Sequence, residues 1–411
     1  MKKRILVLNC GSSSVKYELM DADDSTVLAR GLVEKIGMED AVINHHYLEN
    51  GQYYDIKRVE NVPTHRAGIR IIVELLTSGE HGVVKDLDEI FGIGHRVVHG
   101  GEHYYESVYV NQDVKDDIKK CIELAPLHNP HHLAGIEACE TLIPDHPQVA
   151  VFDTAFHHSM PERAFMYALP YEMYRLHGIR KYGFHGTSHQ YVSQRAAQIC
   201  QRRMSDMKII SCHLGNGSSI CAIKEGKSVD TSMGFTPVAG LMMGTRTGDI
   251  DPAIIIYLMH KEGLSLTEVN SMINRHSGLY GISGISRDFR KIAEEAKEGN
   301  ERAKLALDMF VYRIKHYIGA YVAVMNGIDV LIFTAGIGSN SPKLRSVTCR
   351  DLSYLGIKLD EEKNNEAGSE EGIISREDSA VTVISLPTNE ELLIARETAR
   401  IVEKKKAEGL D

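Results

Sequence analysis

The sequence predicts an α/β protein made of two related domains, each with a mixed sheet flanked by helices, and three observations support this class. A chain of 411 residues is too long for one ordinary hydrophobic core, so two domains are expected. Strand-like and helix-like runs alternate along it. A strand–turn–strand segment also occurs twice, as RILVLNCGSSSVKYELMD at residues 4–21 and as IISCHLGNGSSICAIKEG at residues 209–226. The two Gly-Ser-Ser turns stand 206 positions apart, which implies duplicated domains.

The first domain is expected to combine hairpin strands with helices. Strand-like runs cover residues 5–9, 15–20, 31–36, 53–58, 90–99 and 148–154. Helical spacing of apolar residues covers residues 66–77, 114–124 and 131–142. Because hairpins and helices are interleaved, the sheet should be mixed and not purely parallel.

The second half restarts with three short strands joined by glycine-rich turns, in residues 208–233. Helices are expected at residues 252–261, 266–275, 287–298, 301–325 and 390–405, and further strands within residues 329–338 and 380–391. The lysines at 404–406 complement the dipole of the last helix. Residues 361–372 are expected to form an exposed acidic loop.

Composition excludes several classes of function. A net charge of −9 argues against nucleic acid or an anionic membrane as the main partner. The apolar stretch at residues 5–8 is too short for a signal peptide, and no run approaches the roughly 18 apolar residues of a transmembrane helix. Seven scattered cysteines without a CxxC pair indicate a reduced, cytoplasmic protein.

Twenty histidines make a metal site worth considering. His128, His131 and His132 in HNPHH have spacings that a metal could use. Prolines flank them and no carboxylate stands at ligand spacing, so the sequence favours histidines that bind no metal.

The glycine turns suggest a phosphate ligand. A strand that ends in a Gly/Ser turn and returns as a second strand points backbone N–H groups at whatever lies above the turn. Neither turn is a Walker A motif or a Rossmann fingerprint. One copy alone would suit a plain tight hairpin, whereas two copies imply a phosphate held between the duplicated domains. A third turn, TAGIGSNSP at residues 334–342, leads into a helix and suits the nucleoside end.

Several longer motifs carry a family resemblance. The chain contains, in order, NCGSSSVKY, GHRVVHGGE, VFDTAFH, YGFHGTSH, HLGNGSS, GLMMGTRTGDIDP, AGIGSNSP and PTNEE. In sequence and spacing they resemble the acetate kinase (acetokinase) family over about residues 4–400.

The resemblance implies two actin-like (ribonuclease H-like) domains with the active site in the cleft between them. Residues 1–153 with 391–411 would form the acyl-substrate and phosphate side, and residues 154–390 the nucleotide side. The implied reaction is reversible, direct in-line transfer of a phosphoryl group from ATP to acetate, giving acetyl phosphate and ADP. It would depend on Mg²⁺, which Mn²⁺ could replace, in a cytoplasmic homodimer.

The chemistry of the nucleophile limits what such a protein must supply. Acetate has a pKa near that of Glu, about 4.3, so it is already ionised at pH 7 and needs no general base. The difficulty is that a carboxylate must approach a polyanionic phosphate, so positive charge and positioning are required. Arg96 and Arg246 lie among glycines and fit that need, although either alone would more often be structural.

The resemblance assigns further roles near these arginines. Arg96 and Arg246 match the active-site arginines, and His185 matches the histidine that hydrogen-bonds the phosphoryl group, with His128 as a lesser contributor. Asp153, at the end of a strand, matches the catalytic aspartate, and we expect it to orient Arg96 or the substrate.

Metal and ATP positions follow from the same match. Asn9 and Glu390 match the magnesium-associated positions, where oxygen donors suit a hard cation. The segments matching the ATP contacts comprise Ser12, Lys16, His213, Leu214, Gly215, Asn216, Gly217, Asp288, Phe289, Arg290, Gly336, Ile337, Gly338, Ser339 and Asn340. Lys16 could equally be an exposed strand residue.

Substrate size is expected to follow from Val98, Leu127, Phe184 and Pro237, which match a small hydrophobic pocket for the acyl methyl group. Two residues depart from the family pattern, since Ser339 and Ala239 stand where Glu is usual. The alternatives are a propionate or other short-chain acyl kinase, a kinase with another phosphoryl donor, and a non-catalytic actin-like nucleotide-binding protein. The last would not need Arg96, Asp153, His185 and Arg246 together.

Overall fold

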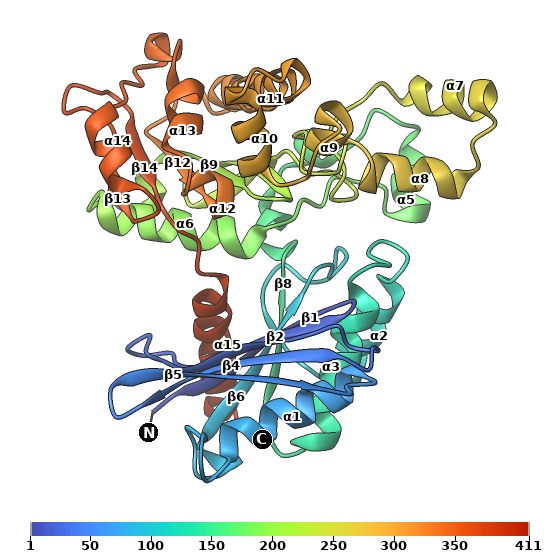
Figure 1. Ribbon diagram of the computed structural model, residues 1–411, viewed down its shortest axis with the longest axis vertical. Coiled ribbons are helices and arrows are strands. Elements are labelled where there is room, and N and C mark those ends of the chain that lie inside the picture. Colours follow the sequence, from blue (N-terminus) through green and yellow to red (C-terminus); the bar gives the residue numbers. More distant parts are fainter. Residues whose placement is uncertain (1, 410–411) are drawn as a thin grey trace. The chain divides into compact units, whose positions relative to one another are not determined.

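The computed structural model describes residues 2–409 and divides into two compact units (Figure 1). Unit 1 runs from the N-terminal residues to Ala155 and resumes at Asn389, and unit 2 is Phe156–Thr388. The sequence placed these boundaries at residues 153/154 and 390/391. In the described residues no helix combines the length and apolar character needed to span a membrane.

Unit 1 is built on an eight-stranded mixed sheet with the order β5-β4-β3-β2-β1-β6-β8-β7. The strands are β1 Arg4–Gly11, β2 Ser14–Asp21, β3 Val27–Glu34, β4 Ala41–Glu49, β5 Gln52–Glu60, β6 Ile90–Val97, β7 Val108–Tyr109 and β8 Gln148–Phe152. β1, β6 and β8 run parallel, whereas β1 to β5 form antiparallel hairpins. The edge strand β5 has no buried residue.

Helices cover both faces of this sheet. They are α1 His65–Thr77, α2 Gln112–Lys120, α3 Asn129–Leu142 and α15 Glu390–Ala407. α3 packs on the face that carries Cys10, because a Cβ on Gly135 would lie 2.5 Å from the Cys10 sulfur. α15 packs on the opposite face, where a Cβ on Gly94 would lie 2.4 Å from Thr398 Oγ1. Arg96 alternates with Gly94 along β6 and therefore faces α15.

Unit 2 contains a six-stranded mixed sheet with the order β11-β10-β9-β12-β14-β13. The strands are β9 Lys208–Leu214, β10 Ser218–Lys224, β11 Lys227–Thr231, β12 Val330–Thr334, β13 Gly372–Ile373 and β14 Thr382–Ser385. The helices are α4 Glu162–Phe165, α5 Tyr171–His177, α6 Gly186–Ile199, α7 Pro252–Glu262, α8 Leu266–Arg275, α9 Gly278–Ser283, α10 Phe289–Lys297, α11 Glu301–Met325, α12 Ala335–Gly338, α13 Pro342–Cys349 and α14 Glu361–Ala367.

Alternation along β9 divides the core of unit 2 into two layers. Ile209 packs in a cluster with Val192 and Ala196 of α6. Ile210 packs in another cluster with Phe310 and Ile314 of α11. Figure 1 shows α6 and α11 on opposite sides of the strands. α11 is thus a core helix, with a buried residue at every third or fourth position.

The two sheets share one topology. An antiparallel hairpin, β1–β2 or β9–β10, is followed in each sheet by two parallel neighbours, β6 and β8 or β12 and β14. This repeat matches the duplicated strand–turn–strand segments of the sequence, and the expected mixed α/β class is confirmed.

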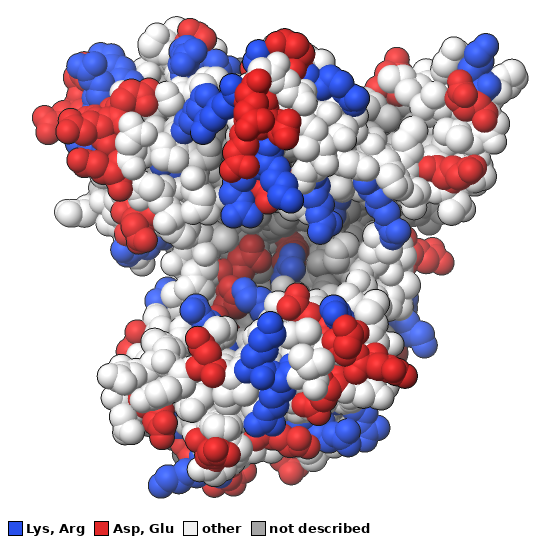
Figure 2. All heavy atoms as spheres, in the orientation of Figure 1, with Lys and Arg blue, Asp and Glu red and all other residues white. Residues whose placement is uncertain are grey.

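Two local expectations were wrong. β4 was not predicted, although Ala41, Ile43, His45 and Tyr47 alternate inward along it. The acidic segment expected as a loop begins with α14, because the Asp360 side chain caps its first N–H groups and Asn364 on its inner face is fully buried. Figure 2 shows acidic side chains gathered over this helix.

Candidate active site

Arg96, which is partly buried, and Asp153, which is buried, form an ion pair at the carboxyl ends of two parallel strands in unit 1. Arg96 lies near the end of β6 and pairs in register with Val151 of β8, and Asp153 follows β8 directly. Arg96 donates to both carboxylate oxygens, from Nε at 3.1 Å and from Nη2 at 2.6 Å. Burial alone would lower the pKa of Arg96, but Asp153 and Glu390 outweigh it and hold that pKa above its usual value. The guanidinium is therefore permanently charged and fixed in orientation.

Glu390 begins α15 on the same face of the sheet. Its Oε2 lies 4.0 Å from Arg96 Nε. The Asn389 side chain caps the helix by accepting from the Leu392 N–H at 2.9 Å. Burial, with repulsion from Asp153 and Glu391, raises the pKa of Glu390 to about 7 despite the attraction of Arg96 and Lys16. A cation bound here would relieve that repulsion.

Asn9 lies level with this carboxylate group. The parallel register that pairs Leu8 with His95 brings Asn9 beside Arg96 on the neighbouring strand. The Asn9 amide makes no hydrogen bond to another side chain or backbone group within residues 2–409. A hard divalent cation prefers oxygen ligands. The amide oxygen of Asn9 and the carboxylate of Glu390, whose charge is disfavoured by its neighbours, therefore fit Mg²⁺.

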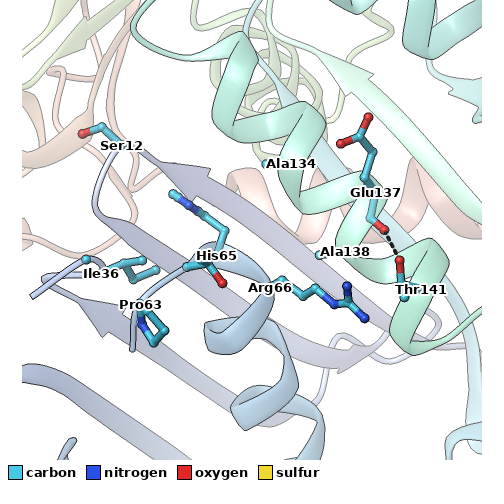
Figure 3. Close-up of a pocket in the computed structure, with 11 residues that line it drawn as sticks. Ser12, Ile36, Pro63, His65, Arg66, Ala134, Glu137, Ala138 and Thr141 are labelled. Carbon is cyan, nitrogen blue, oxygen red and sulfur yellow. Dashed lines mark hydrogen bonds between the residues drawn. The ribbon is translucent and has the colours of Figure 1, made fainter. Parts of the chain in front are cut away.

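Lys16 and Ser12, expected near ATP, have other neighbours within unit 1. Lys16 forms an ion pair with Glu391, the second residue of α15. Ser12 lines an open pocket of about 580 Å³ between α1 and α3 (Figure 3). There His65 points toward the turn of Ser12, with Nε2 2.6 Å from the Gly11 carbonyl oxygen, and Arg66 extends toward Thr141 of α3.

His128, in the HNPHH segment, stands at the N-cap position of α3, although its side chain makes no capping hydrogen bond. It lies beside His132, whose Nδ1 accepts from the Val98 N–H at 3.2 Å. His131 instead stacks on His65, with ring centroids 5.2 Å apart. Among the described residues no three His, Cys, Asp or Glu side chains are grouped to hold a metal. Of the acyl-pocket residues in unit 1, Val98 is buried and Leu127 is exposed.

In unit 2, His185 and Arg246 meet at the turn of the second hairpin. A Cβ placed on Gly217 would lie 3.5 Å from His185 Nε2 and 3.6 Å from Arg246 Nη1. His185 has a left-handed backbone, with φ of 57°, at the start of α6. A β-carbon rarely tolerates this conformation, so the strain marks a site where side-chain placement matters.

Arg246 is a half-buried guanidinium without a carboxylate partner in the described part of the chain. Its Nη1 donates to the Pro237 carbonyl oxygen at 3.2 Å, and burial lowers its pKa. Asp249 anchors the surrounding loop by accepting from the Gly240 N–H at 2.8 Å. A buried cation of this kind is stabilised when an anion binds next to it.

His213 supports His185 from the neighbouring strand. The two rings stack with centroids 4.1 Å apart and an interplanar angle of 22°. Ser188 of α6 contacts His213 Nδ1 at 2.7 Å and donates to Thr388 Oγ1 at 2.8 Å. His213 therefore has two roles in the structure. Its ring packs against His185, and its backbone belongs to β9, the strand that leads to the turn at Gly217.

An open pocket of about 850 Å³ in unit 2 gathers eight of the expected ATP residues. They are Gly215, Asn216, Asp288, Phe289, Arg290, Gly336, Ile337 and Asn340. Arg287, Glu294 and Lys297, which the sequence did not single out, line it as well. Figure 2 shows basic and acidic side chains close together over α10, which forms one wall. Leu214, Gly338 and Ser339 are buried behind this pocket.

Ser339 is turned away from the pocket. Its hydroxyl donates to the Ala335 carbonyl oxygen at 2.7 Å. Behind the same turn lies Arg345, which is fully buried and donates to the carbonyl oxygens of Gly338 at 3.0 Å and Ser339 at 2.5 Å. Nothing in the sequence marks Arg345, because an arginine in a helix is usually exposed.

A family model described as the acetokinase family matches residues 4–396. The chain belongs to the acetokinase family. The acetate kinase of Caldicellulosiruptor saccharolyticus is 54% identical over 402 residues, which cover 98% of this chain and 100% of the relative. The expected class of activity, a kinase with a carboxylate as phosphoryl acceptor, is confirmed.

Solved structures of acetokinase-family proteins match the whole fold. The Porphyromonas gingivalis acetate kinase structure has a TM-score of 0.92 at 47% identity, covering 97% of this chain and 100% of its own. A Francisella tularensis propionate kinase has a TM-score of 0.89 at 42% identity, with the same coverage. The expected actin-like ATPase architecture is confirmed.

Proposed function

We propose that the protein transfers the γ-phosphoryl group of ATP to acetate by direct in-line displacement. An acetate oxygen forms the new bond to phosphorus, and the bond to the bridging oxygen breaks, so that ADP leaves with the electron pair. Family membership supports the reaction class. The observation that carries it furthest is Arg246, a half-buried guanidinium without a carboxylate partner in residues 2–409, beside His185 at Gly217.

In unit 1, Arg96 would bind the acetate carboxylate and Asp153 would hold the guanidinium in place. No base is needed, because acetate is already ionised. The two hydrogen bonds between Asp153 and Arg96 support an orienting role. Asn9 and Glu390 would hold Mg²⁺, or Mn²⁺ in its place, and the bound ion would neutralise charge on the ATP phosphates.

In unit 2, His185 and Arg246 would donate to the phosphoryl oxygens while the group is in transit. The hairpin turn would offer the backbone N–H groups of Asn216 and Gly217 to the phosphates, because the Gly215 N–H already donates to the Gly217 carbonyl oxygen at 3.1 Å. The pocket walled by α10 and α12 would hold the adenosine end. Lys16 would contribute less, because it is paired with Glu391. His128, at the N-cap position of α3, keeps the lesser role that the family match gives it.

Acetate is the proposed acyl substrate. Val98 in unit 1 and Phe184 in unit 2 are buried, and Pro237 lies against Arg246. A small apolar pocket discriminates one methylene by about 1–3 kcal/mol, so propionate should be a poorer substrate and not a non-substrate. The 42% identical propionate kinase keeps propionate as the second candidate.

A homodimer is also part of the proposal, with α7 as the contact. This helix, PAIIIYLMHKE, is apolar around most of its circumference yet buries no residue. Helices with that pattern are normally enclosed. Asp251 precedes the helix and Lys261 lies in its last turn, so an antiparallel second copy would pair opposite charges.

A cytoplasmic location is proposed from the cysteines. All seven lie in the described part of the chain as free thiols, as expected in a reducing compartment.

Trapping of acyl phosphate with hydroxylamine tests the reaction. Acetate, propionate and butyrate would each be paired with ATP, GTP or pyrophosphate. Highest kcat/KM for acetate with ATP is expected. Preference for a longer acid would overturn the pocket assignment and keep the mechanism. Nucleotide binding without acyl phosphate from any pairing would favour a non-catalytic actin-like protein.

A further inference from the structure

His185 is the first of four side chains joined by hydrogen bonds into the interior of unit 2. Its Nδ1 lies 2.9 Å from Ser219 Oγ, which lies 2.8 Å from His189 Nε2. His189 Nδ1 in turn lies 2.9 Å from Ser211 Oγ. His185 stands at the N-cap of α6 and His189 lies four residues later in the helix, and the serines belong to β10 and β9. Ser219, His189 and Ser211 are all fully buried.

Each of these four side chains has only one proton to donate when the histidines are neutral. Burial, with His157 and His213 nearby, lowers the pKa of His189 well below its usual value, so the ring is neutral. A neutral imidazole has one N–H donor and one bare acceptor nitrogen, and each serine hydroxyl has one proton. Ser219 contacts two rings, so it can donate to only one and must accept from the other.

Ser211 decides the direction. Within residues 2–409, the only hydrogen-bond partner of its hydroxyl is His189 Nδ1. A buried hydroxyl leaves its proton unsatisfied unless it donates, which is unfavourable, so Ser211 donates to His189 Nδ1. His189 then carries its proton on Nε2 and donates to Ser219. Ser219 donates onward to His185 Nδ1.

The remaining proton of a neutral His185 must therefore be on Nε2. That nitrogen lies on the side of Gly217, where Arg246 also points. We propose that Ser211, His189 and Ser219 form a one-way hydrogen-bond chain that keeps neutral His185 in the Nε2–H tautomer, ready to donate to the phosphoryl group. This rests on the role given to His185 in the proposed function. The three are positioning residues, since all are fully buried and would act through His185.

The chain provides a donor on Nε2 of a neutral imidazole, without a charge on the ring. A doubly protonated imidazole carries a proton on each nitrogen, and in that form the chain is not needed to place one on Nε2. The titratable groups close to His185 in the described part of unit 2 include Arg246, His213 and His189, with His157 beyond His189. Removing a link should therefore impair catalysis most where His185 is neutral.

The test uses the full chain with ¹⁵N-labelled histidine, and His185→Gln identifies the His185 signals. At alkaline pH the wild type should show a bare Nδ1 and a protonated Nε2. Ser211→Ala and Ser219→Ala should each give a mixture of tautomers. Ser228→Ala is the matched control, because Ser228 is equally buried and contacts His157 Nδ1 at 2.9 Å outside the chain. It should keep the wild-type tautomer.

Kinetics supply a second readout. In Ser211→Ala and Ser219→Ala, kcat at alkaline pH should fall about tenfold while KM for ATP and acetate stays within about twofold. The loss should shrink as the pH falls, and Ser211→Thr should restore activity. A protonated Nδ1 in the wild type, or a loss of equal size at every pH, would overturn the proposal. Wild-type turnover by His185→Ala would instead overturn the role of His185 in the proposed function. The tautomer spectra would still show whether the hydrogen-bond chain sets the protonated nitrogen.

Discussion

Arg96 donates two hydrogen bonds to Asp153, from Nε at 3.1 Å and from Nη2 at 2.6 Å, and Asp153 is only 1% exposed. A guanidinium held in this way presents its outer edge in one direction. We therefore expect Asp153 to contribute through Arg96 and not as a base.

Asp153→Asn should therefore reduce kcat/KM for acetate about 100-fold, or about 3 kcal/mol, because a buried cation loses its partner and its orientation. KM for ATP should change little. Steady-state kinetics with each substrate varied would measure both. Asp230→Asn, which breaks the 2.7 Å pair with Lys181 in unit 2, is the control and should retain activity. Wild-type turnover by Asp153→Asn would remove the residue from the mechanism.

Mg²⁺ binding should weaken below pH 7. The pKa of Glu390 is about 7 in the metal-free protein, because burial and neighbouring carboxylates disfavour its charge. A proton then competes with the metal, so apparent affinity should fall by up to tenfold for each pH unit below that value. Calorimetric titration of Mg²⁺ between about pH 5.5 and pH 8 would measure it. In Glu390→Gln the metal should bind weakly at every pH, and a persistent pH slope would assign the titration to another group.

Glu18 should make the free energy of unfolding fall as the pH rises, which is unusual for a carboxyl group. Burial and repulsion from Glu391 raise its pKa to about 7 from an ordinary 4.5, so the folded protein holds this proton more tightly than the unfolded chain does. The stability difference is fully present below pH 4.5 and is lost as the pH rises through 7.

Glu18→Gln should therefore stabilise the protein by about 1–3 kcal/mol at pH 8 and have almost no effect near pH 4.5. Urea unfolding at the two pH values would measure this. Glu34→Gln, at an exposed position in β3, provides the comparison. Equal effects of Glu18→Gln at both pH values would mean that packing, and not ionisation, is responsible.

Arg345 should govern nucleotide affinity from behind the turn. It donates five hydrogen bonds, all to the carbonyl or amide oxygens of Gly338, Ser339, Asn364 and Gly368. Lysine keeps the charge but cannot reproduce this planar set of donors. Arg345→Lys should lower stability by about 2–4 kcal/mol and raise KM for ATP more than KM for acetate.

The matched control is Arg302→Lys. Arg302 also donates to carbonyl oxygens, of Ile282 at 2.8 Å and Gly281 at 3.2 Å, but it is exposed. Thermal melts with and without ATP would separate the two effects. If both substitutions shift the ATP response equally, Arg345 has no special link to the nucleotide turn.

Ile256→Glu should convert a homodimer into monomers. Ile256 is 71% exposed on α7, and a charge there could not be enclosed by a second copy. Light scattering after gel filtration would report the mass. Leu305→Glu, which changes an exposed apolar residue of α11, should leave the dimer intact. Dissociation by Leu305→Glu alone would move the interface to α11.

Sequence predicted the site best where chemistry and position coincide. Arg96, Asp153 and Glu390 could be selected because motifs and strand ends mark them, and unit 1 brings them within hydrogen-bonding or ionic range. Arg345 and Ser219 could not, since burial gives them their roles and burial depends on the whole fold. His189 had a weak signal, as it follows His185 by four positions and so lies on the same face of a helix.

The prediction of local structure was wrong where the composition of a segment did not reflect its burial. The acidic run at the start of α14 suggested a solvated loop, but contacts between Asn364 and Arg345 hold one turn of it inward. β4 carries an inward His45 in place of an aliphatic residue, which hid the alternation from a hydrophobic pattern.

The edge strand β5 of the first sheet has a consequence for whether the protein aggregates at high concentration. β5 exposes both faces and one row of backbone N–H and C=O groups, which is a template for another strand. Asp55, Lys57, Arg58 and Glu60 place charges along it, so a second chain that paired there would have to confine them. These side chains keep an open β-edge from seeding aggregates.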